Sequence, residues 1–140
     1  MSRTVWTYYK NDWHEGDLRI LGAASHATWL GSLGFDGARL FNGVVPDLDR
    51  HCARLNTSAV ALGLQPILTP ERIESLTHEG LRRFAPGTDV YIRPMYWAEE
   101  SDIGTVPPLA ESTDFALCLE EMPMVEPTGF TITTTSFRRP

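Results

Sequence analysis

The sequence predicts an α+β fold in which an antiparallel sheet of about five strands carries two helices packed on it. Residues 90–98 alternate between two sets of side chains, as in a strand with two distinct faces. Residues 48–62 and 73–84 place apolar side chains three and four positions apart, which is typical of helices with one buried face. Asn42-Gly43 separates two extended segments and is a strong hairpin signal, because both residues accept a positive φ.

Composition and charge limit the classes of function. The chain has 140 residues, enough for one domain with a hydrophobic core, and its formal net charge of -6 argues against nucleic acid or an anionic membrane as a main partner. No apolar run approaches the roughly 20 residues that a membrane span needs, and the N-terminus lacks the apolar region of a signal peptide. The two cysteines, Cys52 and Cys118, are expected to be free thiols in a reducing cytoplasm.

The N-terminal third is expected to supply short strands. Residues 5–10 and 18–21 read as extended segments, and the turn-rich stretch between them indicates a hairpin or two short strands. Residues 22–34 contain small side chains without a clear period, which indicates a loop with one helical turn. Residues 35–41 and 44–45 would then form the two arms of the Asn-Gly hairpin.

Two helices are expected to follow. In the first, Asp47 or Asp49 can cap the N-terminus, Gly63 ends the helix, and one apolar stripe runs along its length. The stripe consists of Leu48, Cys52, Leu55, Ala59 and Leu62. In the second helix Thr69 is the expected N-cap and Pro70 the first helical residue, and Pro86-Gly87 stops the chain from continuing as a helix.

The C-terminal part divides into three expected segments. A strand over residues 115–121 completes a small domain that spans residues 1–121. Residues 122–129 contain two prolines and a glycine and read as an interdomain linker. Residues 130–140 begin with a Thr-rich strand that has no partner of its own and that runs into Arg138, Arg139 and Pro140. The resemblance described below implies that residues 130–140 are the first strand of a large domain that is missing from the chain.

Two arginines are the main candidates for ligand contacts. Arg54 lies one turn after Arg50 on a flank of the first helix, so it is either a surface residue or a phosphate ligand that uses its bidentate fork. Arg93 shares a strand face with Tyr91, Met95 and Trp97. A cation in such a place must find an anion, which is either a protein carboxylate or the carboxylate of a substrate.

Three other groups of residues give weaker evidence of a functional site. Phe35, Gly37 and Arg39 bracket a glycine-rich loop, where Phe35 is either core or pocket wall and Gly37 either a conformational requirement or a ligand contact. Ser25, His26 and Asp36 contain the residue types of a hydrolase triad but lack a nucleophile elbow. No set of histidines, cysteines and carboxylates repeats at metal-ligand spacing, so no metal site is predicted.

The order of these motifs resembles the class IV aminotransferases, the pyridoxal-phosphate (PLP) enzymes of fold type IV that include branched-chain aminotransferases. Ser25-His26-Ala27 and the run from Gly34 to Arg39 are similar to the family's glycine-rich loop, although Asp36 replaces a usual glutamate and Leu30 a frequent tyrosine. His51-Cys52-Ala53-Arg54-Leu55 matches the family's His-x-x-Arg-Leu motif, and residues 91–94 match its Tyr-Ile-Arg-Pro motif.

The resemblance implies specific roles. Arg54 would hold the cofactor phosphate, while Phe35, Gly37, Arg39, Tyr91 and Arg93 would line the substrate pocket from the small domain. The expected parent protein is a cytoplasmic PLP-dependent aminotransferase that acts on amino acids and 2-oxoacids, branched-chain-like, and it would be a homodimer or larger. An aminodeoxychorismate-lyase type of reaction on the same fold is one alternative. A non-catalytic module for anion binding or dimerisation is another.

The catalytic residue of such an enzyme is a lysine, whose amine bonds the cofactor and moves a proton. Lys10 is the only lysine of the chain, and the pattern around it gives no reason to expect a buried amine. In the family the catalytic lysine follows an Arg-Arg-Pro-like segment in the large domain. The resemblance therefore implies no catalytic residue in this chain, which we expect to be inactive alone.

Overall fold

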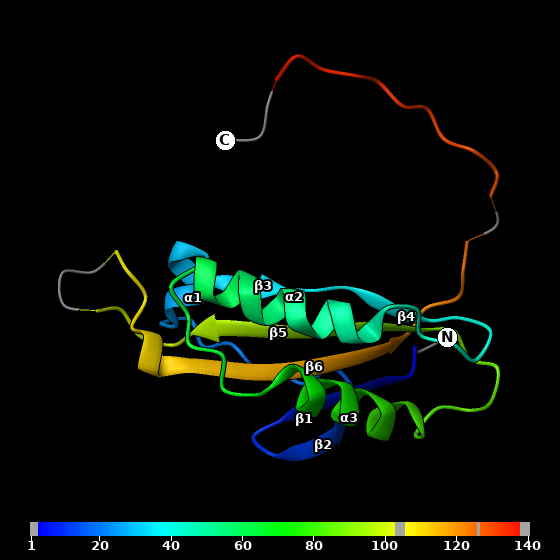
Figure 1. Ribbon diagram of the computed structural model, residues 1–140, viewed down its shortest axis with the longest axis horizontal. Coiled ribbons are helices and arrows are strands. Elements are labelled where there is room, and N and C mark those ends of the chain that lie inside the picture. Colours follow the sequence, from blue (N-terminus) through cyan, green and yellow to red (C-terminus); the bar gives the residue numbers. More distant parts are fainter. Residues whose placement is uncertain (1–2, 103–105, 126, 138–140) are drawn as a thin grey trace.

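A computed structural model describes residues 3–102, 106–125 and 127–137 (Figure 1). Its centre is a six-stranded sheet in the order β2-β1-β6-β5-β3, with β4 also paired to β5, and every pairing is antiparallel. The strands are β1 (Val5–Tyr9), β2 (Asp12–Glu15), β3 (Leu33–Phe35), β4 (Ala38–Leu40), β5 (Val90–Ala98) and β6 (Thr113–Glu121). The helices are α1 (His26–Leu30), α2 (Leu48–Ala61), α3 (Pro70–Leu81) and the short 3₁₀ turn η1 (Ala110–Ser112). The predicted α+β fold is confirmed.

The two long strands β5 and β6 form the middle of the sheet. They pair over nine residues each, from Val90 opposite Glu121 to Ala98 opposite Thr113. The bounds predicted for the strand at residues 90–98 are those observed. Because β5 also pairs with β3 and β4 on its other edge, its backbone is hydrogen-bonded on both edges, which fixes the direction in which its side chains point.

Helices α2 and α3 cover one face of this sheet (Figure 1). Leu55, Ile73 and Leu76 from the helices are fully buried against Ile92 and Leu117 from β5 and β6. The predicted start of α3 is confirmed, since the Thr69 side chain accepts a hydrogen bond from the backbone N–H of Arg72. The main hydrophobic core therefore lies between the two helices and one sheet face.

The last residue of the apolar stripe predicted for α2 is wrong. Leu62 is 42% exposed, whereas Leu64 is buried at 4%. The helix ends at Ala61, and Gly63 has a φ of +76° that turns the chain, so the next apolar side chain to reach the core is Leu64. Asp47 occupies the predicted N-cap position, but its side chain makes no capping hydrogen bond.

The N-terminal hairpin is tighter than predicted. The second strand is β2 at Asp12–Glu15, not residues 18–21, because the chain turns at Lys10 and Asn11 directly after β1. Both turn residues have positive φ, 50° and 65°, as a two-residue hairpin turn requires. Residues 17–20 form no strand and instead cross one face of the sheet, where three of them line a cavity.

The strand predicted at residues 35–41 is divided in two. β3 and β4 both pair with β5 in the same register, and Asp36 and Gly37 between them belong to neither strand, although the Asp36 N–H donates to the Pro94 carbonyl at 3.2 Å. The turn at Asn42-Gly43 has positive φ at both residues, as predicted, but the second arm of that hairpin is only a bridge between Phe41 and Val44.

The strand predicted at residues 130–137 is not formed. The described residues after β6, 122–125 and 127–137, contain no helix or strand and run away from the sheet (Figure 1). Phe130 and Phe137 are 87% and 89% exposed. An extended segment becomes a strand only with a hydrogen-bonded neighbour, and this segment lies against no sheet edge. Residues 138–140, which include Arg138 and Arg139, are outside the described part of the chain. Among the helices that the structure describes, none is both long and apolar enough to cross a membrane.

Candidate functional site

The sheet face that α2 and α3 do not cover carries most of the predicted site residues. We call it the open face, marked by Phe35, Tyr91, Arg93 and Met95. Alternation along β5 places Tyr91, Arg93 and Met95 on this face, and Phe35 lies directly opposite Met95 on β3. Met95 packs in a small second cluster that also contains Trp97 and Cys118. The predicted division of β5 into two distinct faces is therefore confirmed.

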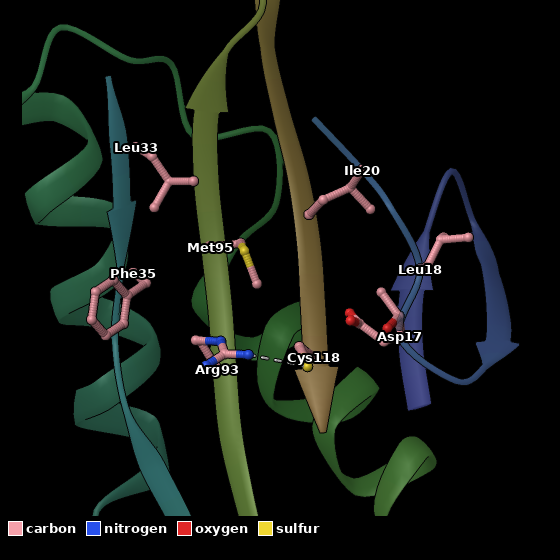
Figure 2. A pocket seen from close by; sticks show the side chains of 9 residues that line it. Asp17, Leu18, Ile20, Leu33, Phe35, Arg93, Met95 and Cys118 are labelled. Atoms are coloured by element: carbon pink, nitrogen blue, oxygen red, sulfur yellow. Dashed lines mark hydrogen bonds between the residues drawn. The ribbon is translucent and has the colours of Figure 1, made fainter. Parts of the chain in front are cut away.

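A cavity of about 300 Å³ opens on this face (Figure 2). Arg93 of β5 and Cys118 of β6 lie side by side in its lining, with Phe35 on one side of them and the segment after β2 on the other. The lining consists of Thr7, Asp17, Leu18, Ile20, Leu33, Phe35, Arg93, Met95 and Cys118. Phe35 is 56% exposed, so it is a cavity wall and not part of the core.

Arg93 forms no ion pair with a described carboxylate, although Asp17 lines the same cavity. Its Nη2 donates to Cys118 Sγ at 3.5 Å, and its Cζ lies 5.8 Å from the centre of the Tyr91 ring. Burial raises the pKa of the Cys118 thiol although Arg93 acts in the opposite direction, so the sulfur is a neutral partner. The guanidinium therefore keeps donors for an anion that enters the cavity.

Gly37, Arg39 and Tyr91 line a second, neighbouring hollow of about 370 Å³ together with His51. A Cβ at Gly37 would lie 2.5 Å from the Tyr91 hydroxyl, so no larger residue fits there without moving the tyrosine. Arg39 has its Cζ 5.8 Å from the Tyr91 ring centre and donates from Nη1 to the backbone carbonyl of Met122. Arg39 is thus already engaged with the chain that follows β6.

Arg54 belongs to a different cluster, at the break between β3 and β4. Its Nε donates to Asp36 Oδ2 at 2.7 Å and its Nη2 to Asp36 Oδ1 at 2.8 Å, while His51 Nδ1 lies 2.8 Å from Oδ1. Burial alone would raise the pKa of Asp36, but hydrogen bonds from Arg54 and His51 outweigh it and lower that pKa. The hydrogen bond to Asp36 in turn raises the pKa of Arg54. Asp36 is therefore an ionised partner of both side chains.

This cluster contains two residues whose role the motifs alone did not reveal. Asp36 lies between Phe35 and Gly37, so its side chain points to the opposite side, toward α2. His51 precedes Arg54 by three positions and therefore lies on the same side of α2. The alternation at residue 36 and the three-residue spacing from His51 to Arg54 were the sequence signals that could have predicted this cluster.

The remaining candidates do not assemble. Ser25 Oγ donates to Glu99, and His26 Nδ1 lies 2.7 Å from Ser32 Oγ, so neither contacts Asp36 and no triad forms. Lys10 makes an ion pair with Asp114 at 2.6 Å, and this hydrogen bond raises the pKa of its amine. Among the described residues, no group of three or more histidines, cysteines and carboxylates could hold a metal ion.

The Arg54 cluster fits the phosphate group of the cofactor that the motifs imply. The Arg54 side chain is 61% exposed, and Asp36 occupies only the edge formed by Nε and Nη2. No described protein group accepts a hydrogen bond from its Nη1. An oriented, accessible guanidinium of this kind is suited to phosphate oxygens.

Comparisons with known proteins agree with these motifs. The family model for amino-transferase class IV matches residues 34–139. A probable branched-chain-amino-acid aminotransferase of Rickettsia bellii is 28% identical over 125 residues, which cover 88% of this chain and 42% of the relative. The protein of the same name from Rickettsia typhi is 35% identical over 124 residues, which cover 80% of this chain and 40% of the relative.

Solved structures give the same picture. An aminotransferase from Brucella abortus, crystallised with the cofactor PLP, matches with a TM-score of 0.94 at 75% identity over 99% of this chain and 49% of its own. The branched-chain aminotransferase of Thermoproteus uzoniensis, crystallised with norvaline, matches with a TM-score of 0.70 at 21% identity over 88% of this chain and 42% of its own, which shows the fold alone. The chain spans less than half the length of each of these four proteins. Since the family model covers most of it, the chain belongs to the class IV aminotransferases.

Proposed function

We propose that this chain is the N-terminal part of a PLP-dependent aminotransferase that exchanges an amino group between amino acids and 2-oxoacids, branched-chain-like in its substrates. One observation carries the proposal for the substrate. Arg93 lines a mainly apolar cavity, where its printed contacts are with the neutral Cys118 thiol and the Tyr91 ring; Asp17 also lines the cavity, but no described carboxylate forms an ion pair with Arg93. Arg93 is half-buried, and removing part of a cation from water without an ion-pair partner costs free energy, which an incoming α-carboxylate would offset.

In this proposal the two arginines have separate tasks. Arg54 would hold the phosphate of PLP, and Arg93 would bind and orient a substrate carboxylate, with Phe35 as an apolar wall beside it. Gly37, Arg39 and Tyr91 would form the adjacent part of the same wall. PLP, when bound, supplies the electron sink for chemistry at the amino-acid Cα.

We infer that the lysine of this chemistry lies outside these residues. A lysine amine that acts as a nucleophile needs a lowered pKa, whereas the pKa of Lys10 is raised by its hydrogen bond to Asp114. Lys10 also lines neither the cavity of Arg93 nor the hollow of Tyr91. On the same proposal, residues 1–121 are the small domain, 122–129 a linker and 130–140 the start of a larger domain.

Two further parts of the proposal concern assembly and location. We propose a homodimer, as implied by the resemblance to enzymes in which a loop of one subunit completes the pocket of its neighbour. We also propose a cytoplasmic location, because Cys52 and Cys118 are both free thiols, as is usual in a reducing compartment.

The substrate role of Arg93 is tested in the full-length protein by Arg93→Ala. We expect KM for the amino-acid substrate to rise about 10- to 100-fold, the range for losing a hydrogen-bonded ion contact. The melting temperature should change little. Arg19→Ala is the matched control, because Arg19 is an exposed arginine between two cavity-lining residues and is not itself part of the lining. An unchanged KM together with a lower melting temperature would mean that Arg93 only stabilises the fold.

A further inference from the structure

We propose that Asp36 is a positioning residue that holds the Arg54 guanidinium ready for a phosphate group; this inference rests on the phosphate role of Arg54 proposed above. Asp36 lies at the break between β3 and β4, outside both strands. Its side chain is only 5% exposed, although it carries a charge. A buried carboxylate needs compensating hydrogen bonds, and Arg54 and His51 supply them.

The geometry leaves the useful edge of Arg54 open. A guanidinium has five N–H donors in a planar fork. Asp36 takes the side-on edge, through Nε at 2.7 Å and Nη2 at 2.8 Å. The end-on edge, formed by Nη1 and the second N–H of Nη2, keeps the spacing that matches two phosphate oxygens. The carboxylate therefore orients the arginine without occupying its phosphate-binding donors.

His51 restrains the carboxylate in turn. His51 Nδ1 lies 2.8 Å from Asp36 Oδ1 and 2.9 Å from Arg54 Nη2. Nδ1 can accept from the guanidinium in one tautomer or donate to the carboxylate in the other. We assign the second, because a hydrogen bond from His51 is among the causes that lower the pKa of Asp36. With three donors on its two oxygens, Asp36 is fixed from two residues of α2 at once.

Pre-orientation matters here because Arg54 is mostly exposed. A long, exposed side chain samples many rotamers, and a ligand that binds it must order it first. Asp36 orders the guanidinium before the ligand arrives. Its own negative charge opposes an anion, so the loss of Asp36 should weaken phosphate binding less than the loss of Arg54 does.

The test compares PLP with pyridoxal, which lacks the phosphate, in the full-length protein. The measured quantity is the ratio of the two dissociation constants in direct binding titrations, which cancels general damage to the site. We expect Arg54→Ala to reduce the preference for PLP about 10- to 100-fold. Asp36→Asn should reduce it about tenfold, the low end for partners that orient a ligating group. Asp36→Glu restores the carboxylate and should recover part of the preference.

Asp47→Asn is the matched control, because Asp47 precedes the same helix and its contact is with Arg50, at 3.7 Å, not with Arg54. It should leave the preference for PLP unchanged. If Arg54→Ala reduces the preference and Asp36→Asn does not, the positioning role is wrong while the phosphate role stands. If neither variant reduces it, both the phosphate role and the positioning role are wrong. A loss in Asp36→Asn that Asp36→Glu fails to recover at all would also overturn the inference.

Discussion

The buried glycine of α3 allows a test in which helix propensity and packing predict opposite signs. Gly80 lies near the C-terminal end of α3 and is buried. Alanine is a better helix former than glycine by about 1 kcal/mol at most in this position. However, a Cβ on residue 80 would lie 2.5 Å from Leu119 Cδ1 and 2.6 Å from Trp13 Cζ2, and closer still to Trp13 Cη2. Non-bonded carbon atoms do not come so close, so the side chain of Leu119 or Trp13, or the helix itself, would have to shift.

Neither neighbour can move freely. Leu119 has no exposed surface, and Trp13 Nε1 donates to Glu79 at 3.0 Å. Overpacking of this kind costs about 1–3 kcal/mol, and the tight contacts favour the upper part of that range. After the propensity gain is subtracted, we expect Gly80→Ala to lower the free energy of unfolding by about 1–2 kcal/mol. Urea unfolding followed by far-ultraviolet circular dichroism measures it, with an unchanged m value.

Two companion variants make the reasoning refutable. Ser75→Ala changes an exposed residue of the same helix and should stabilise by a few tenths of a kcal/mol, from propensity alone. Trp13→Val removes the indole ring, and in that background the cost of Gly80→Ala should fall. A Gly80→Ala chain as stable as the unaltered one would show that the indole does not rest on α3 at this glycine.

Two further predictions concern the titratable groups. Iodoacetamide at pH 8 should leave Cys52 unmodified in the folded chain, because the residue has no exposed surface and burial raises the pKa of its thiol to about 12. Mass spectrometry should find Cys118, which lines the cavity, modified first. If Cys52 were modified first, the packing of α2 described above would be contradicted. The second concerns Asp36, whose pKa is lowered, so its contribution to stability is complete above the usual aspartate pKa of about 4 and is lost as the pH falls below it. The difference in unfolding free energy between the unaltered chain and Asp36→Asn should therefore be constant from about pH 5 to neutrality and shrink below about pH 4; a difference that grows toward acid pH would mean that the carboxylate is not ion-paired.

Local signals predicted most of the fold. β5 was predicted with its observed bounds, because residues 90–98 alternate between two sets of side chains and are rich in aromatic and β-branched residues, which favour a strand. Thr69 and Pro70 fixed the start of α3 in the same way. The second strand of the N-terminal hairpin was predicted at the wrong residues for a different reason. Its turn at Lys10 and Asn11 contains no glycine, and its strand is mostly polar, so neither hairpin signal was present.

The candidate site was predictable only in part. Alternation along β5 placed Tyr91 and Arg93 on one face, which needs no knowledge of tertiary structure. The link between Asp36 and Arg54 depends on α2 folding back over the break between β3 and β4. Likewise, Asp17 and its neighbours reach the cavity only because the tight first hairpin sends the chain back across the sheet. Contacts between residues so far apart in the sequence cannot be predicted from the local pattern of residues.

The contrast between the partners of the two arginines follows from what each would bind on the proposed function. Arg54 is held by an ionised carboxylate, and Arg93 by a thiol that burial keeps neutral. A substrate carboxylate must enter and leave in every turnover, and a fixed carboxylate on Arg93 would compete with it for the same donors. A resident phosphate would not exchange in this way, and it would use the guanidinium edge that Asp36 leaves open. A neutral partner suits the arginine whose ligand is transient, and a charged one suits the arginine that must stay in one orientation.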